Sequence, residues 1–240
     1  MTPDLIRNVS VGADAPTSDK IYLTFDLDWC SDEVLVDTLD MLEAHGVPAT
    51  FFVTHETPLL DRIRANPMNE LGIHPNFNFL LEGDFRYGRT FREVIEHFLR
   101  IVPDAVSVRS HSLVQSSKIL DAFSDCGLTH DCNLFFPLEI RPRAFMHWSG
   151  NLVRVPYIFE DDVECLGGWR NKKTFEELEN LDCIKVLNWH PIHLFLNTEH
   201  LDRYVGSGEV HRVHDSLKNH VNRTSFGARD FLLQILKRCV

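Results

Sequence analysis

Two carboxylates close an apolar stretch near the amino terminus. Residues 21–29 read Ile-Tyr-Leu-Thr-Phe-Asp-Leu-Asp-Trp, so Asp26 and Asp28 are separated by one residue. Alternate side chains of a β-strand point to the same face, which places the two carboxylates together. Like charges on an apolar strand repel and lose hydration unless a cation, hydrogen bonds or a shared proton compensates. The pair therefore indicates either such a site or a strand that ends at Asp26, with Asp28 in a solvated turn or helix cap.

Other ionisable residues also follow short apolar runs. They are His55, His74, Arg109, His111, Asp131, Arg154, His190 and His193. In parallel α/β sheets and barrels, catalytic groups gather at the carboxyl ends of the strands. For His55, His130 or His193 taken alone, a structural or solvated role is a better explanation than a catalytic one. Together, however, carboxylates, imidazoles and a guanidinium suit metal-assisted hydrolysis.

The elements that must position these residues alternate between strand and helix patterns. The pattern predicts strands within 21–29 and at 50–54, 70–73, 105–108, 128–133, 152–155 and 184–190. Ser31 and Gly46 are typical helix-start and helix-stop residues, and Thr90 with Glu93 forms a capping box. A strand, a helix and a second strand in succession predict parallel pairing with a right-handed crossover. The sequence thus predicts an α/β fold with a closed or nearly closed parallel sheet.

Three segments show weaker patterns. Residues 1–20 are polar and predict an irregular lead-in, and residues 134–151 predict a long loop. Toward the carboxyl end, residues 210–221 place apolar side chains on one helical face, and residues 231–236 are part of a final amphipathic helix. No Gly/Ser-rich or Pro-rich linker divides the chain, so we expect a single domain over residues 21–240.

Composition narrows the function classes. The 240 residues carry a formal charge of −11, which argues against non-specific binding to nucleic acid or anionic membranes. No apolar run approaches the roughly 20 residues that span a bilayer, and the amino terminus lacks the pattern of an export signal. We therefore expect a cytoplasmic protein with no membrane span. The six cysteines include no C-x-x-C pair, which favours reduced thiols over a zinc-thiolate site.

The opening of the chain resembles a known enzyme family. The run Leu-Thr-Phe-Asp at 23–26, followed by Gly-Val-Pro-Ala-Thr-Phe-Phe-Val at 46–53, is similar to the start of the polysaccharide deacetylases (NodB-homology, carbohydrate esterase family 4). The resemblance is specific over residues 21–54 and continues to about residue 195 as isolated residues in the expected order. It implies an irregular, TIM-like (β/α)7 barrel and metal-dependent N-deacetylation.

The resemblance also implies catalytic roles. Asp26 matches the family's catalytic base, and Arg109 resembles the arginine that holds this base, although Ser110 and His111 stand where the family usually has Pro-Tyr. His190 resembles the general acid, and His193 is its rival for that role.

The metal ligands implied by the resemblance are less complete. Asp28 stands for the metal-binding aspartate, displaced by Leu27, and His74 for the first histidine of a His-x-x-x-His motif. The second histidine is replaced by Asn78, a poor ligand for zinc, so the third ligand is either Asn78 or His111. A divalent ion is expected, with Zn²⁺ first among the candidates.

The predicted function is removal of an N-acetyl group from an acetamido sugar, an oligosaccharide or a sugar-linked intermediate in surface-polysaccharide assembly. Trp29, Phe77, Phe79 and Trp148 could stack on a sugar ring or belong to the core. Two alternatives stay open: amidohydrolysis of a small non-sugar amide, and a catalytically lapsed barrel that binds a glycan or partner.

Overall fold

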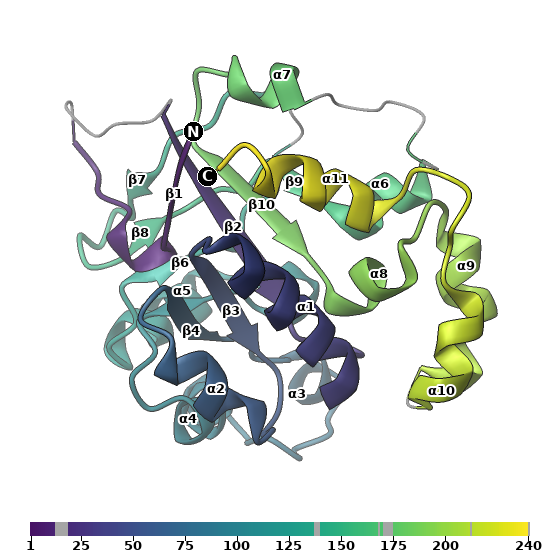
Figure 1. Cartoon of the computed structure of the whole chain (residues 1–240). Helices are drawn as coiled ribbons and strands as arrows, with labels where there is room; N and C mark the ends of the chain where they lie inside the picture. The colour runs from purple at the N-terminus through teal and green to yellow at the C-terminus, as the bar shows by residue number, and fades with distance from the viewer. Residues whose placement is uncertain (13–18, 137–139, 168, 170–174, 212, 240) are drawn as a thin grey trace.

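The structure, a computed structural model, describes residues 1–12, 19–136, 140–167, 169, 175–211 and 213–239 (Figure 1). Its strands are β1 (Thr2–Asp4), β2 (Lys20–Asp26), β3 (Ala49–Val53), β4 (Asn69–Ile73), β5 (Ser107–Val108), β6 (His130–Asp131), β7 (Phe145–Met146), β8 (Val153–Arg154), β9 (Phe159–Glu160) and β10 (Lys185–Trp189). In this part of the chain they form one sheet of ten strands in the order β7-β8-β6-β5-β4-β3-β2-β10-β9, with β1 also paired to β2. All pairings are parallel except β7 with β8.

Helices pack on the outside of this curled sheet and at its ends. They are α1 (Asp32–His45), α2 (Leu59–Ala65), α3 (Asn78–Leu81), α4 (Phe91–Ile101), α5 (Ser117–Asp125), α6 (Asp161–Leu166), α7 (Phe175–Glu179), α8 (Pro191–Leu196), α9 (Leu201–Gly206), α10 (His214–Leu217) and α11 (Ala228–Leu236). Figure 1 shows α1 and α2 over strands β2 to β4, and α11 beside β10. Within the described ranges, no helix is both long and apolar enough to cross a bilayer.

The architecture confirms the predicted α/β fold of the irregular (β/α)7 barrel type, and it confirms two helix signals. Gly46 ends α1 with a φ of +62°, a left-handed conformation that glycine adopts without strain. The hydroxyl of Thr90 accepts a hydrogen bond from the backbone N–H of Glu93 at 3.2 Å, and the Glu93 carboxylate accepts one from the N–H of Arg89 at 2.7 Å. Thr90 is thus the N-cap of α4, whereas Glu93 accepts the N–H of Arg89, the residue before the N-cap, so only the Thr90 half of the predicted capping box is formed.

The structure differs from the prediction in several segments. The lead-in contains β1, where Thr2 lies opposite Lys20, and the predicted loop 134–151 contains β7, which pairs with β8. Strands this short carry no readable alternation, because their pairing is set by the neighbouring strand. The apolar face predicted over 210–221 is divided between α10 and 3-10 turns at Gly208–Val210 and Lys218–His220.

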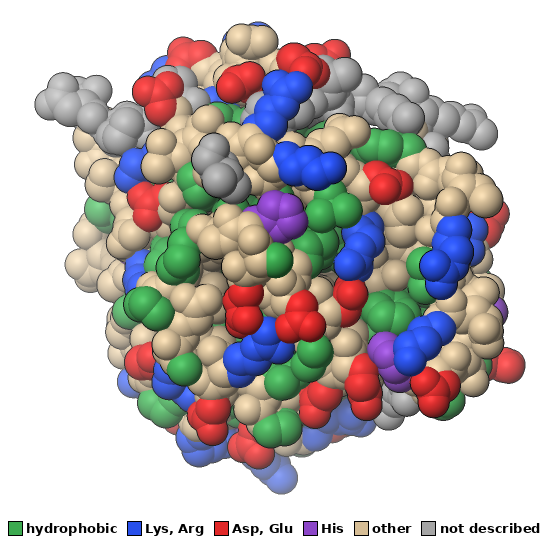
Figure 2. All heavy atoms as spheres, viewed as in Figure 1, with side chains coloured by type: hydrophobic (Ala, Val, Ile, Leu, Met, Phe, Trp, Pro, Cys, Tyr) green, Lys and Arg blue, Asp and Glu red, His purple; other side chains and the backbone are tan. Residues whose placement is uncertain are grey.

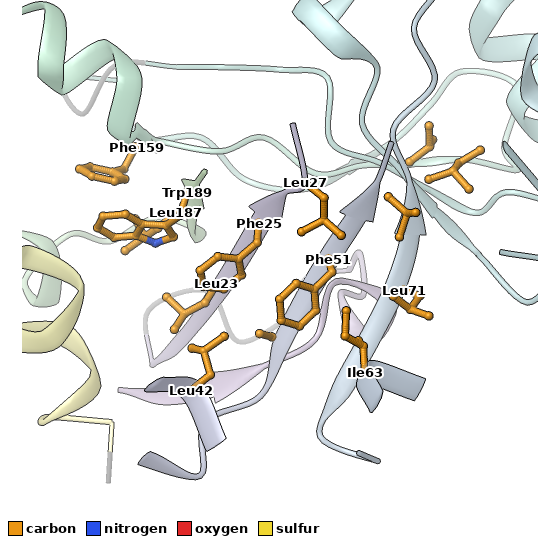
Figure 3. Close-up of a cluster of buried hydrophobic side chains, with 14 of the residues drawn as sticks. Leu23, Phe25, Leu27, Leu42, Phe51, Ile63, Leu71, Phe159, Leu187 and Trp189 are labelled. Atoms are coloured by element: carbon orange, nitrogen blue, oxygen red, sulfur yellow. The ribbon is translucent and has the colours of Figure 1, made fainter. Parts of the chain in front are cut away.

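Strand alternation separates the core from the site. Leu23, Phe25 and Leu27 point to the helix-covered side of β2, where Phe25 stacks on Phe51 with ring centroids 5.3 Å apart (Figure 3). This apolar cluster draws on residues from 21 to 236, and the domain boundary at residue 21 stays a prediction. The intervening Thr24 and Asp26 are also buried, but they occupy the opposite face of the strand. The apolar alternation of β2 therefore directs polar side chains into the concave side of the sheet.

Gly72 in β4 permits close packing beneath the site. A Cβ atom at this position would lie 2.8 Å from Cδ1 of Phe52 and 2.8 Å from the backbone oxygen of Ser107. Glycine therefore lets β4 approach its neighbours β3 and β5. This approach brings the residues that follow β4 and β5 close together.

Charged side chains of both signs share the surface in Figure 2, where acidic and basic groups are interspersed. One example joins α1 and α2, where Arg62 contacts Asp40 at 2.6 Å and Glu43 at 2.7 Å. Such mixing disfavours phosphate-backbone binding on this face, in agreement with the acidic net charge.

Candidate metal and catalytic site

The candidate site residues lie where neighbouring parallel strands end. Asp26 is the last residue of β2, His74 follows β4, and His190 follows β10. Arg109 and His111 come directly after β5. Because β10, β2, β3, β4 and β5 are consecutive in the sheet, these distant segments of the chain meet at one edge.

Asp28, His74 and His111 converge on one point. The Nε2 atom of His74 lies 3.0 Å from Oδ2 of Asp28, and the Nδ1 atom of His111 lies 3.2 Å from the same oxygen. Burial alone would raise the pKa of Asp28, but the two imidazoles outweigh burial and hold that pKa below its usual range. The group is therefore an ionised carboxylate flanked by two imidazole nitrogens.

This donor set fits a divalent transition metal. Two imidazole nitrogens and a carboxylate oxygen are typical zinc ligands, and tetrahedral ligands at such bond lengths lie about 3.3 Å apart. The other nitrogen of His74, Nδ1, is buried without a hydrogen-bond partner among the described residues and lies 3.7 Å from Oδ1 of Asp26. A carboxylate on that side favours the tautomer that leaves Nε2 free to bind a cation.

Asp26 is held by two donors. Nη1 of Arg109 donates to its Oδ1 at 2.9 Å, and Nδ2 of Asn188 donates to its Oδ2 at 3.0 Å. The guanidinium of Arg109 lies between the rings of Phe52 and Tyr157, 4.5 Å from each centroid. Burial alone would raise the pKa of Asp26, but Arg109 and nearby imidazoles outweigh burial and lower it. Asp26 is thus an ionised carboxylate in a fixed orientation.

His190 and His193 differ in charge and position. Nδ1 of His190 lies 2.7 Å from Oδ1 of Asp161, whose other oxygen accepts the backbone N–H of His190 at 2.8 Å. Burial alone would lower the pKa of His190, but Asp161 outweighs burial and raises it well above its usual value. Burial lowers the pKa of His193 to about 4, and its Nδ1 lies 3.1 Å from the hydroxyl of Thr198. Of these two histidines, His190 is the one that combines a raised pKa with a place in the lining of the site pocket.

The pocket has a volume of about 270 Å³. Its lining residues are Asp26, Asp28, Trp29, His74, Ser110, His111, Ser112, Leu113, Glu160, Asp162 and His190. The proposed acid, base and metal ligands therefore all face one cavity that a small substituent of a sugar can enter.

Of the four aromatic residues considered for sugar stacking, Trp29 lines this pocket. It adopts a left-handed φ of +55°, remains 47% exposed and stacks on His190 with ring centroids 5.6 Å apart. Phe77 is buried in the core, whereas Trp148 is 77% exposed, and neither it nor Phe79 lines the pocket.

Several predicted site and strand-end residues lie elsewhere. Asn78 begins α3 and donates from its amide to the hydroxyl of Ser112 at 3.3 Å, outside the pocket lining. Asp131 and Arg154 form a buried ion pair with each other, and His55 is an exposed neighbour of Thr54. These residues therefore stay outside the convergent group.

Sequence reasoning missed Asn188, Glu160, Asp161 and Asp162. The last three follow the apolar run Val-Pro-Tyr-Ile-Phe at residues 155–159. An apolar run closed by carboxylates is the same signal that identified Asp26 and Asp28, so this signal could have found them. Asn188 carried no such signal, because it lies inside a strand.

Comparisons with known proteins identify the family and the fold. A family model described as WbmS-like polysaccharide deacetylase matches residues 23–207. The crystal structure of a Bordetella bronchiseptica protein, described as a polysaccharide deacetylase involved in O-antigen biosynthesis, is 46% identical with a TM-score of 0.91 and covers 100% of this chain and 98% of its own. A polysaccharide deacetylase from Mycobacterium smegmatis is 17% identical with a TM-score of 0.50, over 95% of this chain and 92% of its own, which shows a shared fold. No curated protein matches the chain.

Proposed function

The chain belongs to the WbmS-like polysaccharide deacetylase family, and we propose that it is a metal-dependent N-deacetylase of an acetamido sugar, an oligosaccharide or a sugar-linked intermediate. The observation that carries the proposal is the convergence of Asp28, His74 and His111 in the pocket that also holds Asp26 and His190. A hydrolytic centre needs a cation site, a base and an acid around one cavity, and this pocket offers all three.

Asp28, His74 and His111 would hold the metal. His111 is favoured over Asn78 because its ring nitrogen faces Asp28, whereas the Asn78 amide donates to Ser112. Zn²⁺ is the proposed ion, since it readily takes two nitrogen ligands and one oxygen ligand and leaves a position open. When bound, such an ion supplies Lewis acidity that polarises an amide carbonyl and acidifies a water molecule.

Asp26 would act as the base. Its ionised carboxylate takes a proton from the attacking water, while Arg109 and Asn188 prevent it from rotating away. Because Arg109 also lowers the pKa of Asp26, the base remains available over a wide pH range.

His190 would act as the general acid. An amine leaves poorly as an anion, so a proton must reach its nitrogen as the carbon–nitrogen bond breaks. Asp161 occupies Nδ1 of His190, which leaves Nε2 to donate this proton, and its negative charge keeps the ring protonated. Asp161 is therefore proposed as the positioning residue of the acid.

The biological setting is proposed from similarity. The Bordetella bronchiseptica relative is described as involved in O-antigen biosynthesis, and we propose a related role in surface-polysaccharide assembly. Trp29 offers an exposed aromatic face on which the apolar side of a pyranose could stack. The cytoplasmic location stays a prediction that cell fractionation would test.

The test is acetate release from a panel of N-acetylated sugars, nucleotide sugars and small amides, by enzyme dialysed with and without a chelator. We expect release from at least one acetamido sugar, loss after chelation and recovery with added Zn²⁺. Release from small amides alone would favour the amidohydrolase alternative. No release together with no retained metal would favour the lapsed, glycan-binding barrel.

A further inference from the structure

Glu160 is a carboxylate beside the proposed acid and base to which the reaction above gives no role. It ends β9 and lines the site pocket. One of its oxygens, one oxygen of Asp26 and one ring nitrogen of His190 all lie within 4.8 Å of one another. In the reaction proposed above, Asp26 and His190 act on either side of the bond that breaks, so Glu160 would lie beside the scissile amide.

Two donors fix the orientation of this carboxylate. The hydroxyl of Tyr157 donates to Oε2 of Glu160 at 3.0 Å, and Nδ2 of Asn188 donates to Oε1 at 3.2 Å. An ionised carboxylate accepts about four hydrogen bonds and donates none, so each oxygen of Glu160 keeps a lone pair for a further donor. Glu160 therefore favours a ligand atom that carries a hydrogen over one that carries only lone pairs.

We propose that Glu160 is a specificity-determining residue that accepts the N–H of the scissile amide and so selects N-acetyl over O-acetyl groups. The inference rests on the N-deacetylase function proposed above. An acetamide nitrogen carries one hydrogen, whereas the corresponding ester oxygen carries only lone pairs. In an ester complex the lone pairs of two oxygens would face each other, and the carboxylate would lose a hydrogen bond.

The same contact orients the leaving nitrogen. When the carbonyl carbon becomes tetrahedral, the nitrogen becomes pyramidal and gains a directed lone pair. An N–H held by Glu160 leaves that lone pair free to turn toward His190, the proposed proton donor. His190 then gives its proton to this nitrogen, and the nitrogen keeps the electron pair of the broken carbon–nitrogen bond.

The experiment compares an amide and an ester on the same sugar. Acetate release is measured from the methyl glycosides of N-acetylglucosamine and of 2-O-acetylglucose, and the ratio of the two kcat/KM values is compared between enzymes. Burial, with Asp162 nearby, raises the pKa of Glu160 to about 7, so the assays are run well above pH 7, where the carboxylate is ionised. Glu160→Ala is expected to lower the amide-to-ester ratio about 10- to 100-fold, the effect of one hydrogen bond to a charged group.

A second variant and a matched control separate this role from a structural one. Glu160→Gln keeps the shape of the side chain and adds an N–H donor for an ester oxygen, so the ratio should fall through a faster ester reaction. Asp162→Asn removes one negative charge from the same pocket, but Asp162 is not in the close group with Asp26 and His190, so it should leave the ratio unchanged.

The outcomes are distinct. A ratio unchanged in both Glu160 variants, or lowered equally by Asp162→Asn, overturns the inference and leaves the deacetylase proposal standing. Wild-type enzyme that cleaves only the ester, or neither glycoside, overturns the proposed function on these sugars, and the inference with it.

Discussion

Two groups of charged residues occupy strand ends of the same sheet, and they differ in whether their charges are matched. At β6 and β8, Arg154 meets Asp131 at 2.5 Å, and Asn133 donates to the second oxygen of Asp131 at 2.6 Å. Gln115 accepts from the same guanidinium at 2.6 Å. Each charge in this group has its opposite, and neither Asp131 nor Arg154 lines the site pocket.

At β2, β4 and β5 the balance is different. Two imidazole nitrogens face one oxygen of Asp28, and Nδ1 of His74 lacks a hydrogen-bond partner among the described residues. A buried group of this kind is costly unless a ligand completes it. The comparison shows that residue type at a strand end does not distinguish these two groups, whereas incomplete pairing beside a cavity does, and we infer that the incompletely paired group is the metal site.

The largest expected effect in the incompletely paired group at β2, β4 and β5 is that of Asp26→Asn. An amide cannot accept the proton of water, so kcat should fall about 10³-fold or more. Metal content, measured by mass spectrometry after dialysis, should stay near the wild-type value because Asp26 is not a proposed ligand. Loss of metal instead would mean that Asp26 and Asp28 have exchanged roles.

A substitution in the matched group of Asp131 and Arg154 should change the stability of the protein and not its activity. Arg154→Ala leaves Asp131 buried without its counter-charge, which should lower the free energy of unfolding by about 3–5 kcal/mol in urea titrations. Burial already raises the pKa of Asp131 against the pull of Arg154. The folded variant should therefore bind a proton that the unfolded chain releases, and its stability should fall as pH rises above the ordinary carboxyl pKa.

Metal content and activity per folded molecule provide the control for Arg154→Ala. Both should remain at wild-type values, because neither Arg154 nor Asp131 lines the pocket. A loss of metal from the folded variant would show that the two groups are coupled, and the distinction between them would fail.

The third test separates the two candidates for the last metal ligand. His74→Ala and His111→Ala should each weaken metal binding about 100-fold or more, because each removes one of three protein ligands. Asn78→Ala is the matched control and should leave the affinity unchanged, since its amide donates to Ser112. Competition with a chromogenic chelator measures all three variants. An unchanged affinity in His111→Ala would remove it from the ligand set.

The sequence predicted the parts of the fold that local pattern controls. The alternation in residues 21–26 identified β2 and the direction of Asp26, and the apolar run 184–190 identified β10 and its exit at His190. The two-residue strands β7 and β9 carry no pattern of their own. They exist because the neighbouring strands β8 and β10 offer unpaired backbone groups.

The parts of the site that were missed depend on contacts between distant segments. Asn188 reads as an ordinary strand residue, and only the β10–β2 register, which sets it opposite Thr24, brings its amide to Asp26. The choice between Asn78 and His111 likewise depends on the turn after β5, where Ser112 adopts a left-handed φ of +55°. A single sequence does not show which strand supplies a hydrogen bond or which way such a turn directs a side chain.

The smallest expected effect concerns the charge on the general acid. Because Asp161 raises the pKa of His190, Asp161→Asn should lower that pKa, and the ring should lose its proton at a lower pH. The alkaline limb of the kcat profile should then move toward neutral pH, with a loss of about 10- to 100-fold in kcat above it. His193→Gln is the control and should leave this limb in place, because the pKa of His193 is already about 4. If His193→Gln moved the alkaline limb and Asp161→Asn did not, the general acid would be His193. Pairing with a buried carboxylate would then not distinguish the catalytic histidine from the structural one.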